Sequence, residues 1–176
     1  MKHYDFASKF RALYDSAVDR FVSGRRGADT FCSVEEKAWL TTHGLTAQNL
    51  YDYAEDHVGY GEPGPDSAVA IEVVRHNYFF SVQQGRASGA VLDVEKMPAK
   101  SEAVRGIAWL PRLIPKAKAK LRGELPASLM YCCGGDRSFF KTHDILPAEF
   151  LSVVWRLEHD DAAIVDWVAS RSAAGK

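Results

Sequence analysis

The chain has few cysteines, no long apolar run and almost no net charge, and each shortage excludes a class of protein. Three cysteines among 176 residues, two of them adjacent, do not form the disulfide framework of a small secreted domain. No apolar run is long enough to span a bilayer, and the start of the sequence has no hydrophobic signal core. The net charge of −1 gives no overall attraction to nucleic acid or to an anionic membrane. We therefore expect a cytoplasmic protein that binds neither.

Several motifs of common enzymes are also missing. The sequence contains no G-x-S-x-G nucleophile motif, no glycine-rich nucleotide-binding loop and no H-E-x-x-H zinc motif. A tyrosine-phosphatase loop is excluded as well, because too few residues separate Cys132 from Arg137. These absences leave open whether the protein is an enzyme, and no cofactor is expected.

The most informative feature that is present is a stretch that occurs twice. Residues 31–45 align with residues 131–145. The identical pairs in this alignment are Cys32/Cys132, Thr42/Thr142 and His43/His143. The similarity resumes at an offset of 94 residues after an insertion near residues 59–65. A repeat of this kind indicates that the two halves of the chain share an architecture.

Apolar residues recur at three- and four-residue spacing along most of the chain, which predicts helices. The expected helices cover residues 6–22, 34–42, 47–57, 66–85, 110–121, 136–143, 147–155 and 162–169. We therefore expect an all-α fold, a helical bundle of about eight helices built from two similar four-helix halves. Residues 1–176 would form a single compact domain, with a first half over 1–85, a linker over 86–107 and a second half over 108–176.

Cys133 stands out at the start of the predicted helix 136–143. By the repeat it occupies the position of Ser33, which is the expected N-cap of helix 34–42 in a capping box. The amide dipoles at a helix N-terminus favour a thiolate over a thiol. Cys133 is therefore a candidate catalytic nucleophile.

The residues that follow Cys133 are candidates for binding an anion. The backbone amides of Gly134 and Gly135 could face a negative group, with Arg137 as a charged partner. The simpler alternative is a glycine-rich turn whose helix is capped by Asp136. Both interpretations place Asp136 and Arg137 beside Cys133.

The repeated cysteines and histidines also suggest a zinc site built from Cys32, His43, Cys132 and His143. However, a short helix separates each cysteine from its histidine, so the members of a pair would lie about 15 Å apart. The spacing also differs from that of known zinc motifs. We expect no metal. His43 and His143 are expected at the C-terminal ends of their helices and remain secondary candidates for ligand binding.

The predicted helix at residues 110–121 is basic. Arg112, Lys116 and Lys120 share one face of it, and a solvated face is the simplest interpretation. Arg112 is the exception, because its place in the first turn after Trp109 would let it turn inward to meet Asp136. Arg112 and Trp109 therefore join the candidate ligand site. Binding of nucleic acid is not expected from a chain that is neutral overall.

The second half of the chain resembles a bacterial family known only as domain of unknown function fifty sixty-nine. The resemblance covers about residues 108–176 and is carried by W-L-P-R at 109–112, K-A-K-A-K-L at 116–121 and D-R at 136–137. It implies that Trp109, Arg112, Asp136 and Arg137 belong to a shared framework. It implies no activity.

Together these features predict a helical protein that binds a small anionic ligand between its two halves. One alternative is a cysteine-dependent enzyme that uses Cys133. Another is a homodimeric interaction or scaffold protein, because Tyr78, Phe79 and Phe80 exceed what one helix face needs to bury.

Overall fold

The computed structural model describes residues 3–174, and in this part the chain is mostly helical, as predicted. The described residues contain nine α-helices, eight of them nine residues or longer, and one two-stranded hairpin. None of the helices described combines the length and hydrophobicity that crossing a membrane requires. The chain forms two compact units, which divide between Ala87 and Ser88.

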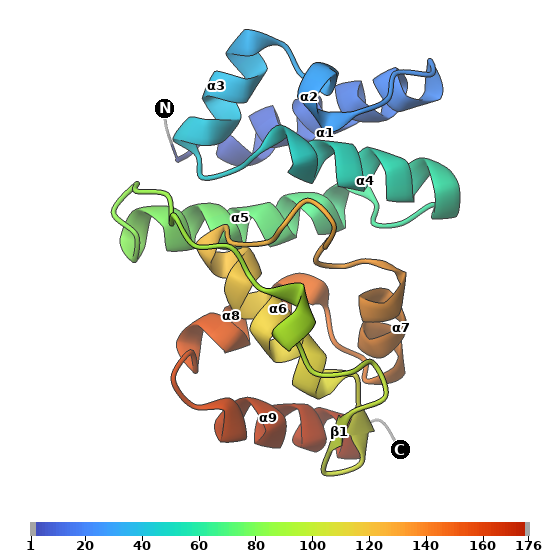
Figure 1. Ribbon diagram of the computed structural model, residues 1–176, viewed down its shortest axis with the longest axis vertical. Helices are drawn as coiled ribbons and strands as arrows, with labels where there is room; N and C mark the ends of the chain where they lie inside the picture. Colours follow the sequence, from blue (N-terminus) through green and yellow to red (C-terminus); the bar gives the residue numbers. More distant parts are fainter. Residues whose placement is uncertain (1–2, 175–176) are drawn as a thin grey trace. The chain divides into compact units, whose positions relative to one another are not determined.

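The first unit consists of five helices (Figure 1). They are α1 (Phe6–Val22), α2 (Ala28–Phe31), α3 (Val34–Thr42), α4 (Ala47–Tyr60) and α5 (Pro65–Ser81). α1 packs on α4 and α5 through Phe6, Phe10, Tyr14 and Ala17, which recur at helical spacing and are buried. The Tyr14 hydroxyl donates to the carbonyl of Pro63 at 2.6 Å, which satisfies the phenol inside the core.

Local signals explain where these helices begin and end. Ser33 and Thr46 form capping boxes at the starts of α3 and α4, as the sequence predicts for Ser33. α3 is followed by Gly44 with φ of 76°, and a Cβ there would lie 2.6 Å from Cγ of Phe79, so both the backbone and the packing require glycine. α5 ends at Ser81 rather than near Gly85, and α2 is a helix that the sequence analysis did not predict.

The second unit contains four α-helices and the hairpin (Figure 1). Its elements are the 3-10 helix η1 (Val94–Lys96), β1 (Ala103–Val104), β2 (Ile107–Ala108), α6 (Leu110–Arg122), α7 (Gly134–Thr142), α8 (Pro147–Arg156) and α9 (Asp161–Ala174). α6 packs on α8 and contacts β1. The segment before α6 folds with this unit, since the amide of Leu92 donates to the carbonyl of Glu124 at 2.8 Å and Met97 is buried.

The hairpin is the main departure from the expected all-α fold. Its strands are antiparallel, with Ala103 opposite Ala108 and Val104 opposite Ile107. The turn residues Arg105 and Gly106 both have positive φ, 51° and 77°, as a tight hairpin turn requires. Strands of two residues are too short to show an alternating pattern, so the sequence analysis missed them.

Two helices in each unit begin one hundred residues apart, the same offset that aligns residues 31–45 with residues 131–145. α3 and α7 each have nine residues, begin at positions 34 and 134, and are followed by His43 and His143. α4 and α8 begin at positions 47 and 147. α7 therefore begins at Gly134, two residues before the predicted start.

Candidate functional site

The first turn of α7 collects most of the predicted site residues. Cys133 is its N-cap in an extended conformation, at the position that the repeat predicts, but its side chain makes no capping hydrogen bond. In the first unit the matching Ser33 accepts a hydrogen bond from the amide of Glu36 at 3.2 Å. Sulfur is a weak acceptor, and the first-turn amides of α7 are left without a side-chain cap.

Asp136 lies at the centre of this cluster and is completely buried. Its Oδ2 accepts a hydrogen bond from Nζ of Lys116 at 2.6 Å and one from the amide of Cys132 at 2.9 Å. Its Oδ1 accepts one from Nε1 of Trp109 at 3.0 Å. Three donors from separate parts of the unit therefore hold this carboxylate, which makes it a hub of the local structure and not a simple helix cap.

Lys116 is the residue of the site that the sequence analysis missed. It projects from α6 and only 2 % of its surface is exposed, so the predicted solvated face is wrong here, and Lys120 is also buried. Besides its bond to Asp136, Nζ of Lys116 donates to Sγ of Cys133 at 3.2 Å. Sγ of Cys133 thus lies beside an ammonium group at the N-terminus of a helix.

The two arginines of the predicted anion site donate to backbone carbonyls. Arg112 donates to the carbonyl of Pro98 at 2.8 Å, so the expected contact between Arg112 and Asp136 is wrong. Lys116, one turn further along α6, takes that place. Arg137 is buried and donates to the carbonyl of Cys132 at 2.7 Å, where it supports the turn that precedes α7.

The indole of Trp109 packs on Gly135 and bonds to Asp136. Trp109 caps α6 with a positive φ of 71°, an uncommon conformation for a large side chain. A Cβ on Gly135 would lie 2.4 Å from Cζ2 of the Trp109 indole. Gly135 therefore lets the indole approach α7 and reach Asp136.

The three cysteines differ in their access to solvent. Cys32 and Cys132 are buried, whereas Cys133 is half-buried. Burial, with a smaller effect of the Asp136 charge, raises the pKa of Cys132 to about 12, and burial also raises the pKa of Cys32. Cys133 is therefore the least buried of the three cysteines.

Each of the two predicted histidines is the C-cap of a helix. His43 follows α3 in the first unit, and its Nδ1 lies 2.7 Å from the carbonyl of Trp39. His143 is at the far end of α7, about 15 Å from Cys133 at the rise of an α-helix. Burial lowers the pKa of His143. In the part of the chain that the structure describes, no three His, Cys, Asp or Glu side chains gather as metal ligands.

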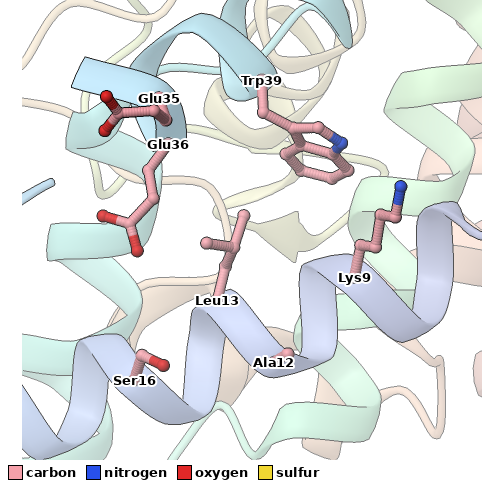
Figure 2. Close-up of a pocket in the computed structure, with 7 residues that line it drawn as sticks. All are labelled: Lys9, Ala12, Leu13, Ser16, Glu35, Glu36 and Trp39. Carbon is pink, nitrogen blue, oxygen red and sulfur yellow. The ribbon is translucent and has the colours of Figure 1, made fainter. Parts of the chain in front are cut away.

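An open pocket of about 360 Å³ lies in the first unit, between α1 and α3. Figure 2 shows Lys9 from α1 toward one end and Glu35 and Glu36 from α3 toward the other, with Leu13 and Trp39 between them. No residue predicted from the sequence for the site lines it. Glu36 is already bound, since Nη2 of Arg20 lies 2.6 Å from its carboxylate.

The comparisons with known proteins agree with the resemblance in the second half. No curated protein and no solved structure matches the chain. The family model described as a domain of unknown function, DUF5069, matches residues 95–176, a range that contains the whole cluster around Asp136. The second half of the chain is therefore a DUF5069 domain.

Proposed function

We propose that the DUF5069 domain holds a cysteine-dependent site in which Cys133 attacks a small electrophile. The observation that carries this proposal is the contact between Nζ of Lys116 and Sγ of Cys133 at 3.2 Å. A thiolate is the nucleophilic form of cysteine, and a neighbouring ammonium at a helix N-terminus stabilises negative charge on sulfur.

Asp136 has a positioning role in this proposal. Because its Oδ2 holds Lys116 at 2.6 Å, the ammonium group has one defined location beside the sulfur. The bond from Trp109 fixes the carboxylate in turn. Lys116 thus contacts the cysteine, and Asp136 holds Lys116 in place. A nucleophile with a neighbouring group that is oriented by a third residue is typical of activated nucleophiles.

The amides of Gly134 and Gly135 would stabilise the product of the attack. They belong to the first turn of α7, which has no side-chain cap. When a thiolate adds to a carbonyl group, negative charge develops on oxygen, and backbone amides at a helix N-terminus are suitable donors to it.

The test is the alkylation rate of each cysteine with iodoacetamide, measured by mass spectrometry across pH. We expect Cys133 to react fastest, and Lys116→Met to slow it by about tenfold or more near neutral pH. Lys116→Arg keeps the positive charge and should retain most of the rate. Cys32 in the first unit is the internal control. Equal rates in folded wild type and Lys116→Met would reject the proposal.

Non-covalent binding of a small anion is a second candidate function, and the missing cap of α7 favours it. Inorganic phosphate should then raise the melting temperature. Cys133→Asp would place a carboxylate over the same amides and abolish the shift, whereas Ser33→Asp in the first unit would leave it unchanged. A shift that survives Cys133→Asp would exclude this location for the anion.

Three further proposals concern the two halves of the chain. Shared boundaries of α3 with α7, and of α4 with α8, support an origin by duplication. An anion bound between the halves remains a proposal. The third proposal is a homodimeric scaffold. Burial of Tyr78 and Phe79 within the unit removes two of the three aromatic residues that suggested a dimer interface. Light scattering would identify a dimer.

A further inference from the structure

We propose that Cys133 and Lys116 form a covalent sulfur–nitrogen bond after a hydroperoxide oxidises the thiol. The inference rests on the proposed function in one respect, since both need a reactive sulfur at Cys133. It adds a modification site and a substrate class, a hydroperoxide, to the DUF5069 domain.

The geometry places an amine directly beside the sulfur that would be oxidised. Nζ of Lys116 is 3.2 Å from Sγ of Cys133, and 2 % of Lys116 is exposed, so its amine stays in position. Cys133 is half-buried, whereas Cys32 and Cys132 are buried, so we take its sulfur as the one that a small peroxide attacks. Groups held together in this way react as if at very high concentration.

The neighbouring thiol is a poorer partner for the oxidised sulfur. A sulfenic acid condenses with a thiol or with a nitrogen. Cys132 is 1 % exposed and burial raises its pKa to about 12, so this thiol stays protonated and shielded. The amine of Lys116 is therefore the favoured partner.

The reaction balances with one molecule of hydrogen peroxide, the simplest hydroperoxide, as the oxidant. The thiolate of Cys133 attacks one peroxide oxygen, so that an S–O bond forms, the O–O bond breaks and hydroxide leaves. Sulfur loses two electrons and the peroxide gains them. The hydroxide takes a proton from the ammonium of Lys116, which gives water and a neutral amine. The amine then attacks sulfur, the N–S bond forms, and the sulfenic oxygen departs as a second water with a proton from nitrogen.

The bond would switch the site off. It consumes the nucleophile and removes the positive charge that faces Asp136 at 2.6 Å. A thiol reductant that attacks the sulfur would release the amine and restore the thiol. The cluster would thus respond reversibly to peroxide.

The experiment treats the full chain with hydrogen peroxide and maps peptides after digestion with a protease that does not cleave at lysine. We expect a peptide pair joining residues 116 and 133, lighter by two hydrogens than the sum of its parts and separated by dithiothreitol. Lys116→Arg keeps the charge and should lack the link. Cys132→Ser and Cys32→Ser should retain it.

Three products would overturn the inference. They are a Cys132–Cys133 disulfide, a sulfinic acid on Cys133 with Lys116 unmodified, and a link that retains an added oxygen. The alkylation rates measured on the reduced protein separate this failure from failure of the proposed function. Fast alkylation of Cys133 without a link rejects only the inference, whereas slow alkylation rejects the proposed function.

Discussion

Removing the positive charge of Lys116 tests whether the buried ion pair organises the DUF5069 domain. The side chains of Lys116 and Asp136 are 3 % and 0 % exposed and their charged atoms lie 2.6 Å apart. Lys116→Met removes the ammonium but keeps most of the apolar stem, so it leaves Asp136 as a buried charge without its cation. Loss of one partner from such a pair costs about 3–5 kcal/mol of the free energy of unfolding.

A double-mutant cycle isolates the interaction from other effects of each substitution. Asp136→Asn retains the shape of the carboxylate and an acceptor for Trp109, but leaves the ammonium buried. The double variant Lys116→Met/Asp136→Asn removes both charges and should cost no more than either single variant. We therefore expect a coupling energy at least as large as the cost of one single variant, about 3 kcal/mol or more.

Urea unfolding followed by tryptophan fluorescence measures these energies. Three of the four tryptophans, Trp109, Trp155 and Trp167, belong to the second unit, so the signal reports mainly on it. Arg20→Met in the first unit is the matched control. Its pair with Glu36 is 24 % and 19 % exposed, and its loss should cost only about 1 kcal/mol. A cost below about 1 kcal/mol for Lys116→Met, or additive effects in the double variant, would refute the reasoning.

Two further predictions concern packing and pH. Gly135→Ala should lower the free energy of unfolding by about 1–3 kcal/mol, because its Cβ would lie 2.4 Å from the Trp109 indole. Gly134→Ala should be neutral or slightly stabilising, because the nearest neighbour of its Cβ is 3.8 Å away. Equal effects of the two substitutions in urea titrations would contradict this prediction. Burial raises the pKa of Cys132 from 9.0 to about 12. The protonated thiol therefore contributes fully to the free energy of unfolding below pH 9, and this contribution is lost as pH rises from about 9 to about 12. Between about pH 8 and pH 10 wild type should lose about 1 kcal/mol more stability than Cys132→Ala, and parallel pH profiles would argue against it.

Helix boundaries were largely predictable because local chemistry sets them. The serine of a capping box and the proline at the start of α8 satisfy or remove helix amides within a few residues of themselves. The same locality placed Cys133 at a helix N-terminus through the repeat. The end of α5 at Ser81 was missed, because Val82 continues the helical pattern and no turn residue appears before Gly85.

The chemistry of the site was only partly predictable, because it depends on contacts between distant residues. Arg112, Lys116 and Lys120 share one helix face, and a sequence gives no reason to bury the second cation instead of the first. Lys116 is buried because Asp136, twenty residues later, meets it inside the unit. One signal was available: the helix at 110–122 contains no acid, so an inward-facing cation on it needs a carboxylate from elsewhere.

The two helix starts that the sequence alignment pairs, at Ser33 and Cys133, differ in how they contribute to folding stability. The hydroxyl of Ser33 accepts a hydrogen bond from the amide of Glu36, while the side chain of Cys133 makes no capping bond. A serine at position 133 would supply a cap worth about 1 kcal/mol. The cysteine instead places sulfur 3.2 Å from the ammonium of Lys116, a contact that a stable helix start does not need. Departures from local folding preferences of this kind are typical of functional positions. The missing cap and the contact with Lys116 together support the proposed reactivity of Cys133.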